Sequence, residues 1–307
     1  MVQSGVLSAA QVTEAMAWAW SENTTQRSGD SSDLADLASA SGQTRLRELA
    51  TDVVERITAP DPQLLAGVDT RVSIEADVTT YRPGESEVWL SLTSPLKHQL
   101  TPRSGVFAID AAFESGAVNQ LRWDGERWYA AGTDGRGSVA VAAHFGFDFA
   151  AEGTAAPLLC LHGGGGAARS SAAAWAAAGG NIWWAGGRRG LDARGPWSTA
   201  LIEKEHLAQQ NGPRLHIDFD VKPGQPAADA PRDADIILHA AYDSAAPPVG
   251  ASSLVEADEF HRILDGRWLL AAQHLDAWAR LFNAAQRDAL PGLALTLTRL
   301  VELESRL

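Results

Sequence analysis

Two kinds of hydrophobic pattern divide the chain. Residues 72–78 and 88–93 alternate apolar and polar side chains, which predicts strands with one buried and one exposed face. Residues 121–132 place Asp124-Gly125 between two arms that carry aromatic side chains, and this arrangement predicts a β-hairpin with a two-residue turn. In the second half the alternation gives way to short continuous apolar runs, which are typical of buried parallel strands.

The clearest unit lies in that second half. Residues 157–162 form a short apolar run, a glycine turn then leads into an alanine-rich segment, and residues 181–186 form the next apolar run. Strand, turn, helix and strand within about 30 residues have the size of one βαβ unit. Residues 214–221 and 234–241 predict two further core strands.

Helical periodicity is found toward both ends of the chain. Residues 8–20 and 44–57 carry apolar side chains at helical spacing, and residues 21–33 between them are rich in Ser, Thr and Asn, which predicts a flexible connector. From Gly266 onward apolar residues recur at steps of three and four. Pro291-Gly292 ends that pattern, and a last helix is expected after it.

The composition excludes several classes of protein. The 307 residues include 38 acidic and 25 basic side chains, a net charge of −13 that repels the phosphates of nucleic acids. The one cysteine, Cys160, cannot form an internal disulfide or, alone, a zinc site. No segment approaches the roughly 18 apolar residues of a membrane span, and no basic residue before Arg27 marks a signal peptide. We expect a soluble, cytoplasmic monomer or homodimer.

A glycine motif lies where the first strand of the βαβ unit meets its helix. Gly163, Gly165 and Ala168 spell G-x-G-x-x-A, in which bare backbone lets a pyrophosphate approach the N–H groups of the helix N-terminus. A merely flexible turn is the plainer interpretation of these glycines, but the flanking strands favour a dinucleotide site.

The end of the second strand indicates which dinucleotide is bound. Sites for NAD place an Asp or Glu there to bond the ribose hydroxyls, whereas sites for NADP place cations against the 2′-phosphate. Here Arg188 and Arg189 follow the strand, with no acid before Asp192. Two solvated arginines on a surface loop are the plainer interpretation of the pair, but the missing acid is an independent signal. The sequence favours NADP.

Three stretches of the first half form an ordered series. They are Leu-Thr-Ser-Pro-Leu-Lys at 92–97, Ser-Gly-Ala-Val-Asn at 115–119 and Gly-Thr-Asp-Gly-Arg-Gly at 132–137. In this order and spacing the chain resembles the shikimate dehydrogenase family, whose members carry Val-Thr-x-Pro-x-Lys, Gly-Ala-Val-Asn and Asn-Thr-Asp-Gly-x-Gly. The family's Gly-x-Gly-Gly-x-x-Arg matches residues 163–169, and its late Gln matches Gln273.

The resemblance implies roles for individual residues. Lys97 and Asp134 correspond to the family's catalytic lysine and aspartate, Asn119 and Gln273 would bind substrate hydroxyls, and Thr93 lies beside the same site. An ammonium group suits a ketone reduction, because it can stabilise and protonate the oxygen on which negative charge develops. Taken singly, a surface lysine and a turn aspartate are the plainer interpretations of the catalytic pair.

Two further correspondences are partial. Ser39 and Ser41 stand where members carry Ser-x-Ser-Pro to hold the substrate carboxylate, and residues 239–242 (His-Ala-Ala-Tyr) stand where members carry Asn-Ala-Thr-Ser after a later strand. The residues expected to bind the cofactor are Gly163, Gly165, Gly166, Ala167, Ala168, Arg169, Arg188 and Arg189.

The pattern and the resemblance together imply an α/β fold with two domains. An N-terminal α/β substrate-binding domain at residues 46–145 would be joined by helices of residues 262–307, and a Rossmann-like NADP-binding domain would occupy residues 146–260. Residues 1–45 are an N-terminal extension without an assigned role. The implied reaction on a small-molecule substrate is the reversible reduction of 3-dehydroshikimate, or a close cyclic hydroxy-acid analogue, in aromatic amino acid biosynthesis. A related protein without turnover, acting as a binding or regulatory module, is the alternative.

Overall fold

The structure is a computed structural model that describes residues 88–92, 96–98, 100–102, 106–123, 127–221, 234–241, 256–257, 262–282 and 284–304. The predicted features that lie outside these residues are the helices at 8–20 and 44–57, the strand at 72–78, the hairpin turn at 124–125, and Ser39, Ser41 and Thr93.

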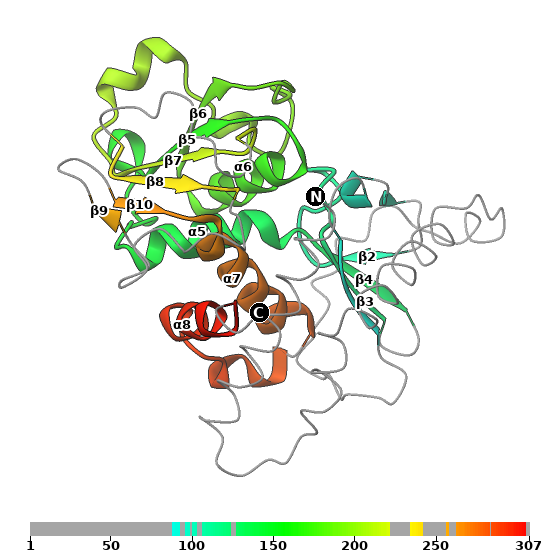
Figure 1. The fold of residues 1–307 in the computed structure, drawn as a ribbon. Coiled ribbons are helices and arrows are strands. Elements are labelled where there is room, and N and C mark those ends of the chain that lie inside the picture. Colours follow the sequence, from blue (N-terminus) through cyan, green and yellow to red (C-terminus); the bar gives the residue numbers. More distant parts are fainter. Residues whose placement is uncertain are drawn as a thin grey trace. The chain divides into compact units, whose positions relative to one another are not determined.

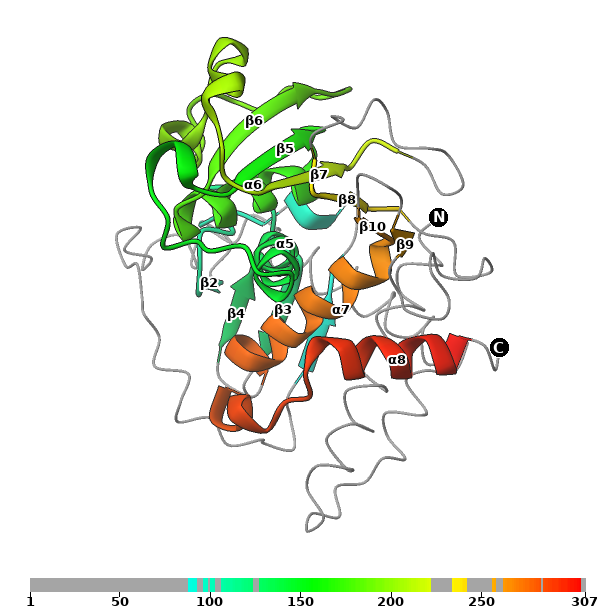
Figure 2. The same ribbon diagram turned by 90° about the vertical axis from the view of Figure 1, so that its left-hand side faces the viewer.

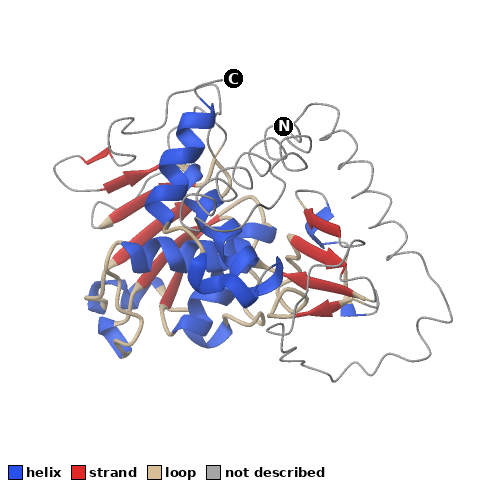
Figure 3. Ribbon diagram, turned by 90° about the horizontal axis from the view of Figure 1, so that it is seen from below, coloured by secondary structure: helices blue, strands red, loops and turns tan. Residues whose placement is uncertain are grey.

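The first sheet contains four short strands. In chain order they are β1 (Val88–Ser91), β2 (Phe107–Ala108), β3 (Gln120–Trp123) and β4 (Trp128–Ala131). Their order in the sheet is β1-β3-β4-β2. Figure 3 draws the strands of the protein in red and its helices in blue. β3 pairs antiparallel with both β1 and β4, which confirms the expected hairpin arms, and β2 runs parallel to β4. The buried side chains of this part are Leu92, Leu100, Val106, Ala112, Val118, Leu121 and Ala130.

The second sheet is mainly parallel and contains six strands (Figure 1). In chain order they are β5 (Leu158–His162), β6 (Asn181–Gly186), β7 (Arg214–Asp218), β8 (Ile236–His239), β9 (Glu256–Ala257) and β10 (Arg262–Leu264). Their order is β6-β5-β7-β8-β10-β9, in which the first five run parallel and β9 pairs antiparallel with β10 at the edge. The four core strands expected from the sequence are confirmed, and the α/β fold class with them.

The continuous apolar run of β5 follows from its position inside this sheet. Its neighbours are β6 and β7, and Leu158, Leu159 and Leu161 are all fully buried. A strand covered on both faces needs apolar side chains at successive positions, and each fully buried leucine contributes about 1.5–3 kcal/mol of transfer free energy. Trp175 closes the space beside β5, and its indole N–H donates a hydrogen bond to Pro157 O at 3.2 Å.

Three α-helices accompany the parallel sheet in the chain. They are α5 (Thr133–His144), α6 (Gly166–Ala178) and α7 (Gly266–Ala277), and Figure 2 shows α5 nearly end-on. A Cβ at Gly135 of α5 would collide with the backbone carbonyl of Ser170 in α6, and a Cβ at Gly137 would lie 3.1 Å from Leu269 O in α7. The absence of side chains at these two glycines therefore allows α5 to contact both neighbouring helices.

The remaining helical segments are short or close to the C-terminus. The short ones are η2 (Leu96–His98), η4 (Gly153–Ala155), η5 (Ser198–Ala200), η6 (Lys204–Gln209), the π-helix η7 (Trp278–Phe282) and η8 (Ala284–Ala289). The last helix is α8 (Leu293–Glu304), which follows Pro291-Gly292 as expected. None of the helices described has the length and apolar character needed to cross a membrane.

The chain divides into two compact units. The described residues up to Thr133 and from His274 onward form the first, and residues 134–273 form the second. The residues from His274 onward therefore belong with the first sheet: the buried Arg122 of β3 donates from Nη1 to Leu281 O at 3.0 Å. The division falls at 133/134 and 273/274, whereas the sequence suggested boundaries near 145 and 262. The close contacts of Gly135 and Gly137 explain why most of α5 and α7 belongs to the second unit.

Candidate functional site

The turn between β5 and α6 consists of the four glycines at 163–166. Gly163 has a φ of +111°, and its N–H donates to Gly186 O at 2.7 Å. Its carbonyl accepts a hydrogen bond from Trp184 Nε1 at 3.1 Å. The end of β6 therefore holds the first glycine of the turn through both of its backbone polar groups.

The next two glycines leave the start of α6 open. A Cβ at Gly164 would collide with the backbone carbonyls of Arg189 and Gly190, so the loop after β6 lies directly against the glycine turn. Gly165 is the N-cap of α6 and has no side chain with which to cap the helix. The first N–H groups of an α-helix lack intrahelical acceptors and carry its partial positive charge. The N–H groups at this end of α6 can therefore donate hydrogen bonds to a phosphate oxygen, as binding of a dinucleotide requires.

Two arginines add positive charge beside the glycine turn. Arg169 lies in the first turns of α6, and Arg189 lies in the loop after β6. Burial lowers the pKa of the half-buried Arg169, and the positive charge of Arg189 lowers it further. Two guanidinium groups that repel each other are close in space, and an anion between them would be favourable.

Arg188 has a different environment from Arg189. Its backbone N–H donates to Asp220 Oδ2 at 2.6 Å, and its guanidinium Nη2 lies 3.3 Å from Asp220 Oδ1. Asp220 follows β7, and a Cβ at Gly187 would lie 3.0 Å from its Oδ2. The acidic side chain of Asp220, in the segment after β7, therefore contacts the loop after β6, where the sequence places Arg188 and Arg189.

The carboxyl ends of three neighbouring strands carry a row of polar residues. In the register of the sheet His162 of β5 pairs with Asp218 of β7, and Asp218 pairs with His239 of β8. His162 Nδ1 lies 3.0 Å from Asp218 Oδ1, which also accepts the N–H groups of Asp220 at 2.8 Å and Val221 at 3.2 Å. Asp218 therefore fixes the turn that positions Asp220. Burial lowers the pKa of His239, while the negative charges of Asp265 and Asp218 act in the opposite direction.

His216 lies two residues before Asp218 in β7, on the same face of the sheet. It is 1% exposed, and neither ring nitrogen has a hydrogen-bond partner among the described residues. Burial lowers its pKa to about 4, against an opposing effect of Asp218 and with smaller contributions from His162 and His239. Its ring is therefore neutral at pH 7. Within the described part of the chain no group of His, Cys, Asp and Glu side chains has the arrangement of a metal site.

The first unit contains Lys97 and Asn119, two of the residues that the resemblance implicates. Lys97 is half-buried in η2. Asn119 is buried just before β3, where its Oδ1 accepts the N–H of Thr133 at 2.6 Å and its Nδ2 donates to Thr133 Oγ1 at 3.1 Å. The carboxamide thus holds the residue at which α5 begins and which directly precedes Asp134 in the chain.

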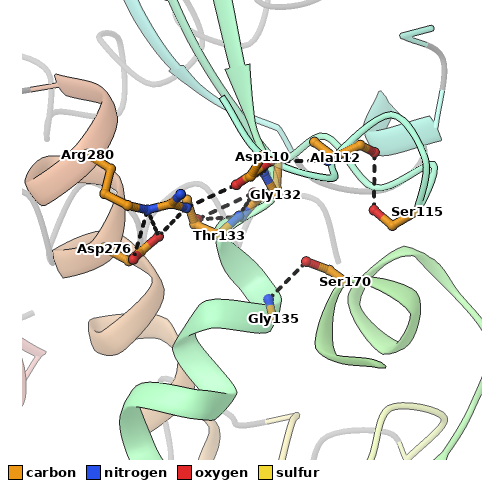
Figure 4. Close-up of polar contacts among 10 residues, drawn as sticks. Asp110, Ala112, Ser115, Gly132, Thr133, Gly135, Ser170, Asp276 and Arg280 are labelled. Carbon is orange, nitrogen blue, oxygen red and sulfur yellow. Dashed lines mark hydrogen bonds and ion pairs between the residues drawn. The ribbon is translucent and has the colours of Figure 1, made fainter. Parts of the chain in front are cut away.

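A network of charged groups supports the same segment of the first unit (Figure 4). Asp110 accepts the N–H of Gly132 at 3.0 and 3.1 Å from its two carboxylate oxygens, and its Oδ2 also lies 3.0 Å from Arg280 Nη2. Arg280 in turn donates from Nη2 to Asp276 at 2.7 Å. Burial would lower the pKa of Arg280, but the carboxylates of Asp276 and Asp110 outweigh it and raise that pKa. This network fixes the backbone just before Asp134.

Asp134 and Gln273 belong to the second unit. Asp134 is buried in the first turn of α5, and the next residue, Gly135, donates its N–H to Ser170 Oγ at 2.9 Å (Figure 4). Gln273 lies in α7, half-buried, where its backbone N would be 3.0 Å from a Cβ at Gly137. Lys97 and Asn119 lie in one unit and Asp134 and Gln273 in the other, so their shared role in one site stays a prediction.

Several polar residues of these sites carried no usable signal in the sequence. Asp218 and Asp220 lie at the end of an apolar run, where they resemble turn residues, and His162 resembles the last residue of a strand. In the sheet β7 neighbours β5 and β8 lies one strand further, so the segment after the adjacent strand is residues 219–221. Strand order cannot be read from a single sequence, since either strand could be adjacent to β5.

The described fold defines an α/β protein with a Rossmann-like unit, in which a glycine turn joins strand β5 to the uncapped helix α6 beside Arg169 and Arg189. No family model and no curated protein matches the chain. Among solved structures the chain is similar to shikimate 5-dehydrogenase from Thermus thermophilus in complex with shikimate, with 18% identity, a TM-score of 0.48 and coverage of 74% of this chain and 81% of that chain. The complex of that enzyme with NADP(H) and shikimate has 18% identity, a TM-score of 0.45 and coverage of 73% and 80%. Shikimate dehydrogenase from Mycobacterium tuberculosis has 21% identity, a TM-score of 0.45 and coverage of 69% and 78%.

Proposed function

We propose that the protein is an NADP-dependent oxidoreductase that interconverts a small cyclic hydroxy acid and its ketone, with shikimate and 3-dehydroshikimate as the reference pair. The observation that carries the nucleotide part is the uncapped start of α6 beside Arg169 and Arg189. The three stretches at residues 92–97, 115–119 and 132–137 carry the substrate part, because their order and spacing resemble the shikimate dehydrogenase family.

The glycine turn is suited to the pyrophosphate and the loop after β6 to the 2′-phosphate. The N–H groups at the start of α6 would donate hydrogen bonds to the pyrophosphate oxygens near Gly165 and Gly166, because these glycines have no side chain to occupy that space. Arg189 and Arg188 would hold the 2′-phosphate, since a guanidinium binds phosphate by charge-assisted hydrogen bonds of about 1.5–3 kcal/mol each. The cofactor supplies the hydride acceptor for oxidation of the alcohol.

In this proposal Lys97 and Asp134 handle the proton. During alcohol oxidation the amine of Lys97 would take the hydroxyl proton, and in the reverse direction its ammonium would stabilise and protonate the oxygen. Asp134, buried at the start of α5, would orient that ammonium and bond an adjacent hydroxyl. Asn119 and Gln273 would bind further hydroxyls, with Thr93 beside them and Ser39 and Ser41 for the carboxylate.

One observation favours the alternative of a related binding or regulatory module without turnover. The carboxamide of Asn119 bonds Thr133 through both its oxygen and its nitrogen, so those two hydrogen bonds are committed to the fold. An Asn that acts in this way as a structural bridge has less capacity to bind a substrate hydroxyl. A nucleotide-binding protein with this geometry could keep its fold without the reaction.

Oxidation of shikimate by the purified protein with NADP tests the proposal. The wild type should reduce NADP, and Lys97→Ala should lower kcat by about 10²–10⁴-fold, the usual contribution of a general acid or base. NADP binding, measured by titration calorimetry, should be unchanged in that variant. Lys204→Ala removes an exposed lysine from η6 and is the matched control, with unchanged kcat.

The outcomes separate the two candidate functions. NADP binding without turnover on shikimate, quinate or an aminoshikimate would support the binding module. Turnover that survives in Lys97→Ala would exclude the proposed role of this lysine. Absence of binding to both NADP and NAD would contradict the nucleotide site itself.

A further inference from the structure

An ion pair that the sequence does not suggest joins the loop after β6 to the segment after β7. Asp220 comes from the segment after β7, yet its carboxylate contacts Arg188 at both the backbone N–H and the guanidinium. The side chain of Asp220 is 15% exposed and that of Arg188 is 74% exposed. The carboxylate is therefore largely covered by the protein, while the guanidinium that contacts it is exposed to solvent.

The position of Asp220 is determined by the fold rather than by Arg188. Asp218 Oδ1 accepts the N–H of Asp220, which holds the turn after β7. The Asp220 carboxylate lies beside the glycine turn, 3.7 Å from where a Cβ on Gly163 would be, and beside Gly187. A negative charge thus stays next to the cations that the proposed function assigns to a phosphate.

We propose that Asp220 is a specificity-determining residue that competes with the 2′-phosphate of NADP for the guanidinium of Arg188. This inference rests on the proposed function and deepens it. To bind a 2′-phosphate, Arg188 must leave the Asp220 carboxylate, whereas NAD has no phosphate at that position and leaves the pair intact. Asp220 therefore reduces the difference in affinity between NADP and NAD. Arg189 has no ion pair with a carboxylate among the described residues, so its guanidinium does not have to leave a carboxylate to bind the 2′-phosphate.

Asp220→Asn is the informative substitution, because it removes the charge and keeps the shape. The amide oxygen of the new side chain can still accept the Arg188 N–H, so the loop keeps its hydrogen bond. We expect NADP to bind up to about fivefold more tightly, because an exposed ion pair contributes up to about 1 kcal/mol. NAD affinity should change by less than about twofold, since its adenosine ribose presents no charge.

Asp192→Asn is the matched control. Asp192 lies in the same loop region, is exposed and pairs with Arg194 rather than Arg188. It also removes one negative charge from the protein, so a general effect of net charge would appear equally in this variant. We expect it to leave both affinities unchanged.

The role of Arg188 is isolated by a double-mutant cycle. Affinities for NADP, NAD and 2′-phospho-AMP are measured by titration calorimetry in wild type, Asp220→Asn, Arg188→Ala and the double variant. Competition for the guanidinium predicts that Asp220→Asn tightens NADP and 2′-phospho-AMP in the wild-type background and has a smaller effect when Arg188 is absent. Circular dichroism and thermal unfolding of each variant confirm that the fold is retained.

The remaining outcomes overturn the inference in distinguishable ways. An equal or larger effect in the Arg188→Ala background means that Asp220 repels the phosphate directly, without competition. Weaker NAD binding in Asp220→Asn means that the carboxylate bonds the ribose hydroxyls. Unchanged NADP affinity in Asp220→Asn overturns the inference while the proposed function stands. If neither wild type nor Asp220→Asn binds any of the three nucleotides, the proposed function fails and the inference fails with it.

Discussion

Replacing His216 with leucine should remove much of the acid sensitivity of the parallel sheet. His216 is 1% exposed in β7, and burial lowers its pKa to about 4 from the ordinary value of 6.5. A histidine with a lowered pKa stays neutral in the folded protein while the unfolded chain binds a proton. The contribution of the neutral His216 to the free energy of unfolding is therefore fully present above pH 6.5 and is lost as the pH falls toward 4.

The size of the effect follows from the two pKa values. A shift of one pKa unit corresponds to about 1.36 kcal/mol, so the full difference between pH 8 and pH 3 approaches about 3 kcal/mol. At pH 5 the two titrations have separated enough for a loss of about 2 kcal/mol. At pH 8 leucine should be neutral or stabilising, because it replaces a buried ring that has no hydrogen-bond partner among the described residues.

Urea unfolding from pH 8 to pH 5 measures this difference. At each urea concentration, a pulse of hydrogen exchange at one fixed labelling pH measures the unfolded fraction. Peptides that cover β5 and β7 give this fraction for the parallel sheet separately from the rest of the chain. The free energy of unfolding of wild type should fall relative to His216→Leu by about 2 kcal/mol over that range. His206→Gln, at an exposed position in η6, is the control and should follow wild type. Parallel pH profiles for wild type and His216→Leu would refute the reasoning.

Two further predictions concern the packing around α5 and the network before it. Gly135→Ala should lower the free energy of unfolding of the second unit by about 1–3 kcal/mol in thermal unfolding, because the new methyl group collides with the Ser170 backbone. Gly190→Ala is the control and should be neutral, because the space around Gly190 is open. Equal behaviour of the two variants would contradict the close contact at Gly135. Asp110→Asn should cost about 1–3 kcal/mol in urea unfolding, because the half-buried Arg280 loses one of its two carboxylate partners. Asp288→Asn, in an exposed pair 3.8 Å from Arg287, should cost less than about 0.5 kcal/mol. Equal losses would show that Arg280 does not need Asp110.

The elements that the sequence predicted well are those whose signal is local. β5 and β6 were found because residues 157–162 and 181–186 are apolar and flanked by glycine turns, and the structure places the strands at Leu158–His162 and Asn181–Gly186. The hairpin arms β3 and β4 were found by their turn residues and aromatic side chains. β10 was missed because three residues are too few to display a period.

The polar contacts were missed because they depend on which strands are neighbours. Asp220 and Arg188 are separated by 32 positions in the chain, and no local pattern connects them. The sequence correctly showed no acid between β6 and Asp192, but the Asp220 carboxylate that contacts this loop comes from the segment after β7. The cofactor interpretation from local sequence was therefore incomplete for a physical reason: the parallel sheet brings the ends of separate strands to one edge.

The same edge shows how a strongly acidic chain can keep a site for a phosphate. Two of the described acids at the carboxyl ends of its strands have an arginine partner: Asp220 Oδ1 lies 3.3 Å from Arg188 Nη2, and Asp265 Oδ2 lies 2.6 Å from Arg267 Nη1. These partnerships reduce the local negative charge, while Arg169 and Arg189 stand close enough to repel each other beside the uncapped start of α6. Since charges separated by more than about 10 Å of salt solution are largely screened, these neighbours outweigh the net charge of −13 at the glycine turn. Net charge is therefore a guide to extended partners such as nucleic acids, whereas the affinity for a single dinucleotide is decided by which carboxylates at this edge are already paired.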